Sequence, residues 1–468
     1  MVNSKRARSG KPRIQPRGCT YIEPQGVFQG LKRVRKAARR DASLRFTNLL
    51  HHITEQMLRE AYSALNPKAA PGVDRVTWAE YGEGLENRLS DLHGRVHRGS
   101  YRAKPSLRTY IPKSDGQQRP LGIAVVEDKI VQQAVVWVLQ AIYEEDFCGF
   151  SYGFRPGRSQ HNALDALWVA IMQRKVNWVL DADICGFFAS IDHQWMMKFV
   201  EYRIGDQRIL RLINKWLTAG VSEDGQWSST VVGTPQGATI SPLLANIYLH
   251  YVLDLWVEAW RKRHAQGEVY IVRYADDWVM GFQYQADAEA FHQLLEERMQ
   301  GFGLKLNAQK TRLLEFGRFA MDNRAKRGEG KPETFEFLGF THICARRCKD
   351  RGFVVWRKTI AKRLRMKIKQ VKGELKHRRH DPVSVQGRWV CSVVRGYYNY
   401  HAVPGNIYAL GQFHKQVGRA WLRALRRRSQ KGRRLTWARL QKLLDTWLPR
   451  PRILHPYPNQ RLRVTNPR

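Results

Sequence analysis

The feature that most constrains the fold is a pair of apolar segments separated by two adjacent aspartates. Residues 269–273 and 278–282 are rich in β-branched and aromatic side chains, and Ala275, Asp276 and Asp277 lie between them. Such segments favour strands, and a connection this short requires a tight turn. We therefore predict an antiparallel hairpin with carboxylates at its tip.

A third aspartate is expected to lie beside that tip. Residues 176–184 form another run with strand character, and Asp183 stands near its end. If the segments are neighbours in one sheet, three carboxylates point towards a common site. Carboxylate oxygens are ligands that Mg²⁺ prefers, and two Mg²⁺ ions can bridge an attacking hydroxyl and a triphosphate. We expect the three aspartates to be catalytic, and to hold two Mg²⁺ ions together with Ile184.

The charge of the chain is distributed unevenly along its length. Overall, 80 Lys and Arg stand against 41 Asp and Glu, a net charge of +39. Residues 1–40 contain 12 basic and one acidic residue, residues 341–468 contain 33 basic and four acidic residues, and residues 41–340 are close to neutral. Basic residues can simply cover solvated helices, but this imbalance indicates a polyanionic partner. Nucleic acid is favoured over a membrane, because Trp and Tyr are interleaved with the basic residues over long segments.

Length and periodicity indicate several domains of mixed α and β structure. A chain of 468 residues is too long for one ordinary core. Apolar spacing predicts helices at 31–40, within 44–100, at 127–143 and at 159–174, and a hairpin formed by 107–111 and 119–123. After about residue 355 the pattern becomes helical and basic. This order predicts helices packed on an antiparallel sheet, followed by a separate helical domain.

Several segments resemble the sequence motifs of reverse transcriptases, in the same order along the chain. They are IPKSDGQQRPLGI, DADICGFFASIDH, TPQGATISPLLANIYLHYVL, the turn Tyr274-Ala275-Asp276-Asp277, GLKLN with Lys310 after it, and FLGF at 337–340. An Asp-Asp turn by itself is usually a solvated turn, and these neighbours are what favour a catalytic one. The resemblance assigns the first catalytic aspartate to Asp183 rather than to Asp181.

The same resemblance assigns roles to residues around the nucleotide. Lys113 and Arg119 would neutralise the triphosphate, unless they only solubilise a hairpin tip. Phe188 would exclude a ribose 2′-hydroxyl, or be a plain core residue. Gln236 would lie along the template and the incoming nucleotide, or belong to a structural loop. Lys310 would stand near the leaving pyrophosphate, or form an ordinary ion pair on a helix surface.

More narrowly, KAAPGVDRVT at 68–77 and SYGFRPGRS at 151–159 resemble segments of bacterial group II intron-encoded reverse transcriptases and maturases. The resemblance implies an α+β right-hand polymerase fold, with fingers and palm built on an antiparallel sheet and an all-helical thumb. It divides the chain into a basic N-terminal extension (1–43), fingers and palm (44–354), a helical thumb or maturase (X) domain (355–430), and a basic segment that could be a DNA-binding remnant (431–468). The sequence lacks the cysteine pairs of the His-Asn-His endonuclease that many relatives carry, so the primer would come from another source.

The implied function joins RNA-directed DNA synthesis to RNA binding. The protein would bind group II intron RNA, promote its splicing, and use dNTPs to copy an RNA template from a DNA primer for retrohoming into target DNA. The residues expected to contact RNA are Lys358, Lys362, Arg363, Arg365, Lys369, Arg395, Tyr397 and Tyr398. A bacterial cytoplasmic protein without a membrane partner is expected, and the oligomeric state stays open. A free-standing reverse transcriptase recruited to defence or repair, or a non-catalytic RNA-binding splicing factor, are the alternatives.

Overall fold

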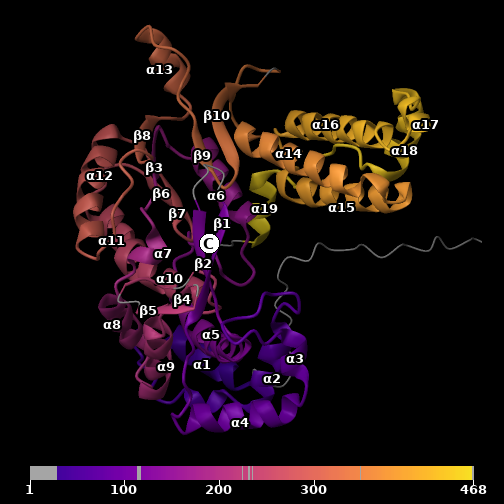
Figure 1. The fold of residues 1–468 in the computed structure, drawn as a ribbon. Helices are drawn as coiled ribbons and strands as arrows, with labels where there is room; N and C mark the ends of the chain where they lie inside the picture. The colour runs from indigo at the N-terminus through magenta and orange to yellow at the C-terminus, as the bar shows by residue number, and fades with distance from the viewer. Residues whose placement is uncertain are drawn as a thin grey trace, which may run out of the picture.

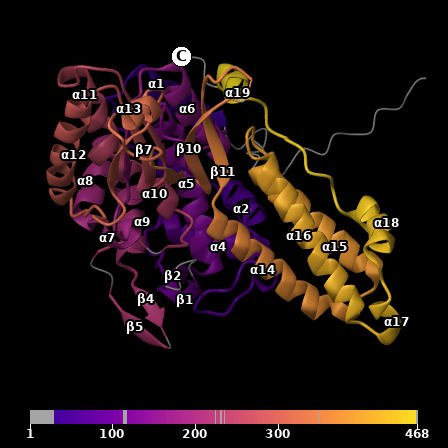
Figure 2. The ribbon, with the colours of Figure 1, turned by 90° about the horizontal axis from the view of Figure 1, so that it is seen from above.

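The computed structural model describes residues 29–112, 118–223, 225–229, 232–234, 236–347 and 349–465. N-terminal helices and a central region built on sheets form the body, and a bundle of C-terminal helices projects from one side of it (Figures 1 and 2). Within the described ranges, no helix is both long and apolar enough to cross a lipid bilayer.

The N-terminal helices surround one long helix. They are α1 (Gln29–Arg40), α2 (Glu55–Ala64), α3 (Trp78–Gly82), α4 (Leu85–His97) and the central α5 (Val126–Asp146), with a 3-10 turn at Leu50–His52. Thr54 begins α2 by accepting a hydrogen bond from the backbone N–H of Met57. α1 packs on α5, where Arg35 and Arg39 lie 2.6 and 2.8 Å from the Glu145 carboxylate. The helix predicted at 31–40 is therefore confirmed, and it is part of the body.

The central sheet is antiparallel throughout. Its strand order is β6-β7-β3-β8, formed by β3 (Trp178–Ala182), β6 (Val269–Tyr274), β7 (Asp277–Phe282) and β8 (Arg312–Glu315). The helices in this region are α6 (Gln160–Gln173), α7 (Phe187–Ser190), α8 (His193–Arg203), α9 (Gln207–Thr218), α10 (Ser241–Leu249), α11 (Leu255–Arg263), α12 (Gln285–Gln300) and α13 (Ala320–Lys326). The predicted strands and the predicted hairpin between 269 and 282 are confirmed.

A second sheet contains one parallel pairing. Its order is β2-β1-β4-β5, formed by β1 (Ser106–Pro112), β2 (Gln118–Ile123), β4 (Val221–Glu223) and β5 (Gln226–Ser228). β1 and β2 form the predicted hairpin, but β1 and β4 run parallel. The sequence predicts only the β1–β2 hairpin of this sheet. β1 and β4 can run parallel because a long crossover through helices separates them and lets β4 return in the same direction.

The last third of the described chain contains a small sheet and a helical bundle. The sheet has the order β11-β10-β9, from β9 (Phe335–Phe337), β10 (Phe340–Arg346) and β11 (Phe353–Thr359). It is followed by α14 (Ala361–His377), a 3-10 turn at Arg378–His380, α15 (Val383–His401), α16 (Ile407–Arg426), α17 (Gln430–Arg433), α18 (Trp437–Trp447) and α19 (Pro458–Thr465). We call α14 to α18 the helical bundle. α19 leaves the bundle and packs against α6 of the body (Figure 2).

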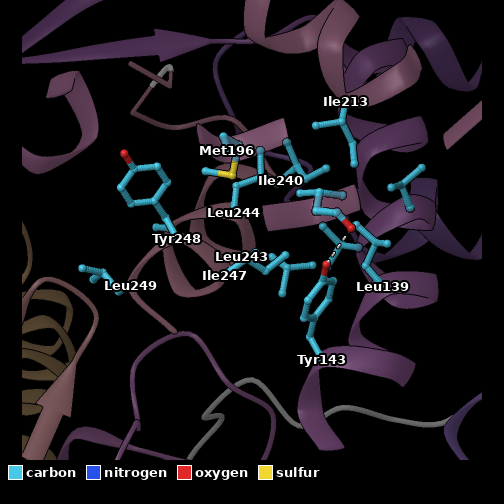
Figure 3. Packing of buried hydrophobic residues seen from close by; sticks show 14 of the residues in the cluster. Leu139, Tyr143, Met196, Ile213, Ile240, Leu243, Leu244, Ile247, Tyr248 and Leu249 are labelled. Atoms are coloured by element: carbon cyan, nitrogen blue, oxygen red, sulfur yellow. Dashed lines mark hydrogen bonds between the residues drawn. The ribbon is translucent and has the colours of Figure 1, made fainter. Parts of the chain in front are cut away.

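Three clusters of buried apolar side chains organise these elements. The first joins the N-terminal helices to the central sheet, and Figure 3 shows the part of it where α10 residues Leu243 and Ile247 lie near Leu139 and Tyr143 of α5. The second joins α6 and the central sheet to β9, β10 and β11, and the third lies within the bundle. The boundary predicted between 354 and 355 falls inside β11, and α18 of the predicted 431–468 segment contributes Leu440 to the bundle core.

Candidate active site

The central sheet brings the three predicted catalytic aspartates to one end of its strands. One residue beyond the last β3–β7 pair, Asp183 lies opposite Asp277. Tyr274 pairs with Asp277 at the end of the β6–β7 hairpin, which leaves Ala275 and Asp276 as the turn. Ala275 adopts a φ of +58°, in the left-handed region that a residue with a Cβ enters at a cost. The three carboxylates, one following β3 and two at the β6–β7 turn, therefore lie at one site.

The electrostatics of this site reflect crowded negative charge. Partial desolvation and the negative charges of Asp276 and Asp183 raise the pKa of Asp277 to about 6. Desolvation and Asp183 also raise the pKa of Asp276, while the Arg119 guanidinium acts in the opposite direction. A group of carboxylates that repel one another favours a bound cation.

Asp181 lies on the same strand but has a different partner. Its carboxylate lies 3.6 Å from the guanidinium of Arg312 on β8. Desolvation raises the pKa of Asp181 to about 6, and Arg312 opposes that shift. The neighbouring strand therefore engages Asp181, and the choice of Asp183 as the catalytic residue stays a prediction.

A loop that enters β8 surrounds Asp183. The Nζ of Lys310 lies 2.9 Å from Oδ2 of Asp183, and the backbone N–H of Asn307 donates to the Asp183 carbonyl at 2.8 Å. The Asn307 side-chain amide donates to the same carboxylate oxygen at 3.3 Å. Lys310 does form an ion pair, but its partner is the predicted catalytic carboxylate.

The chemistry of the candidate ligand atoms suits a hard divalent cation. Asp183, Asp276 and Asp277 offer only oxygen ligands, as Mg²⁺ prefers. The side chain of Ile184 is a hydrocarbon and is buried at 5% exposure, so only its backbone carbonyl could contact an ion. Among the described residues, no three His, Cys, Asp or Glu side chains are gathered closely enough to hold an ion as they stand. The Lys310 ammonium supplies positive charge beside Asp183, and the carboxylates would have to turn towards one another to bind a metal.

The residues predicted to contact the nucleotide lie on segments that are hydrogen-bonded to one another. The N–H of Gly122, on the same strand as Arg119, donates to the Gln236 carbonyl at 2.7 Å, and the N–H of Thr234 donates to the Phe188 carbonyl at 2.8 Å. The Phe188 ring is half-buried and lies edge-on to Phe187 at 5.4 Å. Lys113 lies outside the described residues. Hydrogen bonds therefore join the segment of Arg119 to that of Gln236, and the segment of Phe188 to Thr234, and Arg119 also acts electrostatically on Asp276.

Comparison with known proteins decides the family. A family model described as reverse transcriptase (RNA-dependent DNA polymerase) matches residues 111–342, which include all three aspartates. Protein YkfC of Escherichia coli K12 is 35% identical over 310 residues, covering 58% of this chain and 81% of that protein. The chain belongs to the reverse transcriptase family. Enzymes of this family generally use divalent metal ions.

Two further relatives narrow the group. The group II intron-encoded protein LtrA of Lactococcus lactis is 40% identical over 178 residues, which are 36% of this chain and 29% of LtrA. A 91 kDa protein in the cob intron of Schizosaccharomyces pombe is 43% identical over 154 residues, 33% of this chain and 19% of that protein. The chain spans less than a third of either relative. These matches place the reverse transcriptase among the group II intron reverse transcriptases and maturases.

The predicted RNA contacts of this reverse transcriptase separate into two groups. The basic ones, Lys358, Lys362, Arg363, Arg365, Lys369 and Arg395, are exposed. Tyr397 and Tyr398 are buried in the bundle core at 6% and 2% exposure, and Tyr397 stacks on Phe413 at 3.8 Å. The expectation that these two rings stack on RNA bases does not fit their burial; helical periodicity turns them inwards, away from Arg395. Arg363 also acts electrostatically on Asp277, so it lies near the active site.

Three polar residues of the reverse transcriptase that the sequence interpretation left aside lie directly behind the turn that carries Asp276. Arg273, Asp254 and Asn246 are buried at 0%, 0% and 1% exposure and are bonded to one another. A signal for them exists in the sequence. Arg273 is a charged residue that ends an apolar strand just before the aspartate pair, and Asp254 follows an apolar helix.

Proposed function

We propose that this reverse transcriptase synthesises DNA at the site formed by Asp183, Asp276 and Asp277, with two Mg²⁺ ions as cofactors. The observation that carries the proposal is the strand register, which sets Asp183 opposite Asp277 and Asp276 in the adjoining turn. When bound, the ions would activate the primer hydroxyl and neutralise the triphosphate. The carboxylates supply the ligands, with Ile184 contributing through its backbone.

The residues around the aspartates would hold and orient the dNTP. Arg119 already acts on the charge of Asp276, and Lys113 would join it at the triphosphate. Lys310 supplies a positive charge beside Asp183, where the departing pyrophosphate needs one. Phe188 and Gln236 are joined to the same surface through Thr234 and Gly122, which suits a steric check on the sugar and a contact along the template.

The cationic regions would bind the RNA. In this proposal the body is the fingers and palm of a right-hand polymerase, and the helical bundle with its exposed basic residues is the thumb and maturase domain. Residues 341–468 carry 33 basic and four acidic residues, which suits a large structured RNA because phosphate contacts supply affinity. The protein would bind group II intron RNA, promote its splicing, and copy it into DNA for insertion at a target DNA.

Primer extension tests the active site. Purified protein with Mg²⁺ should extend a DNA primer on an RNA template, and Asp276→Ala should lower the rate by at least about a thousandfold, since the metal site loses a ligand. Asp91→Ala removes a surface carboxylate of α4 and serves as the matched control, which should extend at the wild-type rate. Undiminished extension by Asp276→Ala would refute the assignment.

Sequencing the RNA that copurifies with the protein tests the partner. Intron RNA should be enriched over total cellular RNA, and neutralising Lys362, Arg365 and Lys369 should reduce the enrichment. Copurified RNA that mirrors the cellular pool would contradict the proposed partner and leave the polymerase assignment standing.

A further inference from the structure

A fully buried ion pair lies directly behind the turn that carries Asp276. The Nε and Nη2 of Arg273 donate to the two carboxylate oxygens of Asp254 at 2.7 and 2.5 Å. Both side chains have 0% exposure. This two-point geometry fixes the plane of the guanidinium as well as its position.

The third nitrogen of the guanidinium, Nη1, forms a hydrogen bond with the turn that carries Asp276. The Nη1 of Arg273 donates to the carbonyl of Ala275 at 3.0 Å and to Oδ1 of Asn246 at 3.0 Å. Ala275 is the residue with the left-handed φ of +58°, and Asp276 follows it directly. A conformation of this kind costs energy and persists where surrounding contacts hold it. The bond from Arg273 is such a contact.

A second segment packs against the same turn. The side-chain amide of Asn246 donates to the carbonyl of Gly153 at 2.7 Å, and a Cβ added to Gly153 would stand 2.2 Å from the backbone nitrogen of Ala275. The backbone of Arg273 also forms two hydrogen bonds with this segment: its N–H donates to the carbonyl of Phe150, and its carbonyl accepts from the N–H of Tyr152. The turn is thus enclosed by the 150–153 loop and by the Arg273 side chain.

The helix that supplies Asn246 and Asp254 has a local irregularity that brings them together. α10 continues into α11 through a π-helical turn at His250–Asp254. In a regular α-helix, residues eight positions apart are rotated by about 80°, whereas residues seven apart differ by about 20°. One extra residue in a π turn gives an eight-residue spacing nearly the alignment of a seven-residue spacing, so Asn246 and Asp254 share the face towards Arg273. The apolar residues of α10 meanwhile point into the core (Figure 3).

We propose that Arg273, Asp254 and Asn246 are positioning residues that hold the Ala275–Asp276 turn in the conformation that binds divalent metal. This inference rests on the proposed function, because it concerns the same aspartates. A buried ion pair adds little stability compared with an apolar pair of similar volume. An apolar pair, however, has no donor for the Ala275 carbonyl, and that donor is what the arrangement supplies to the site.

The test replaces the whole pair and so avoids leaving one buried charge alone. The variant Arg273→Met with Asp254→Leu removes both charges and the donor to Ala275. The matched control is Arg203→Met with Asp146→Leu, a buried pair whose guanidinium bonds to the carbonyl of Leu44 instead. Each protein is examined by thermal unfolding, by Mn²⁺ titration without substrate using the electron paramagnetic resonance signal of free Mn²⁺, and by primer extension over a range of Mg²⁺.

The expected result is specific to the first variant. It should bind Mn²⁺ at the Asp276-dependent site about tenfold more weakly, and need about tenfold more Mg²⁺ for half-maximal extension, as expected when outer contacts of metal ligands are lost. Primer–template affinity should stay within about twofold of wild type, because the nucleic-acid surface is untouched. The control variant should keep wild-type metal dependence, even if it melts at a lower temperature.

A folded Arg273/Asp254 variant with wild-type Mn²⁺ affinity and extension would overturn the proposal, since the pair would then be purely structural. If that variant does not fold, Asn246→Ala keeps the ion pair, and unchanged metal dependence in this variant would overturn the proposal as well. A wild-type protein that binds Mn²⁺ through Asp276 but does not extend primers would refute the proposed function, while the Mn²⁺ comparison would still decide this inference.

Discussion

The catalytic body and the helical bundle use charge in opposite ways. In the body, ionised side chains are buried in pairs, such as Arg273 with Asp254 and Arg203 with Asp146. In the bundle, basic side chains such as Lys362 and Arg365 are exposed. Buried pairs fix the geometry of the backbone around them, whereas exposed charges on flexible side chains supply attraction that depends on salt. The buried pairs suit the body to precise geometry at one site, and we propose that the exposed charge of the bundle serves contact with a long polyanion.

Among the changes that test this comparison, removing charge from the bundle should have the strongest effect. Changing Lys362, Arg365 and Lys369 together to Gln should weaken RNA binding about 10- to 100-fold at physiological salt, and lower the slope of log affinity against log salt by about 2 to 3, because three phosphate contacts are lost. Filter binding over a salt series measures both. Extension of RNA–DNA already bound at saturating protein should keep its rate.

A matched control removes the same charge from the body. Lys175, Lys262 and Arg263 are exposed on the catalytic body, and their change to Gln should alter RNA affinity by less than about threefold. Equal losses in the two triple variants would break the comparison, because affinity would then follow total charge and not its location.

A second prediction concerns the junction where the end of the chain returns from the bundle to the body. His161 of α6 stacks on His455 at 3.9 Å, close to Arg461 and Arg357, both of which pair with Asp165. Desolvation and the charge of His455 lower the pKa of His161 to about 3. The unfolded chain takes up a proton at this histidine below about pH 6.5, and the folded protein does not, so the free energy of unfolding should fall as the pH falls from 6.5 towards 3.

The contribution of His161 to that pH dependence reaches about 1.4 kcal/mol per pH unit. His161→Gln keeps a donor for the Tyr400 carbonyl, which His161 Nε2 contacts at 2.9 Å, and should reduce the acid slope in denaturant unfolding by about one proton. An equal acid slope in the variant and in the wild type would show that protonation of His161 at the junction does not contribute to the pH dependence of unfolding.

The weakest effect is expected from a change that tests which residues of the bundle form its core and which form the proposed RNA-binding surface. Tyr398→Leu removes the ring and keeps an apolar side chain. It should change RNA affinity by less than about twofold, because the ring is buried; a base stacked on it would be worth about 1 to 3 kcal/mol. Its hydroxyl finds no hydrogen-bond partner among the described residues, so its loss costs little. The exposed Arg395→Gln is the paired comparison and should weaken binding more than Tyr398→Leu does.

The features that can be predicted from the sequence alone are local. Strand periodicity and short turns predict the β6–β7 hairpin with its aspartates and the β1–β2 hairpin. Helix periodicity predicts the basic α1, and composition predicts the cationic C-terminal region. The resemblance to reverse transcriptases added the family, because its motifs are contiguous segments. These features depend on residues close together in the chain.

Contacts between residues far apart in the chain, and the choice of which helix face is buried, become visible only in the folded structure. Lys310 pairs with Asp183 across 127 residues, and Arg273 with Asp254 across 19. In the sequence, Tyr398 is an aromatic residue within a basic helix, and only the packing of that helix shows that its ring faces the core. The parallel β1–β4 pairing likewise depends on where a long crossover returns. Periodicity within one segment carries no information on which distant segment will face it, so these partners emerge only when the chain packs.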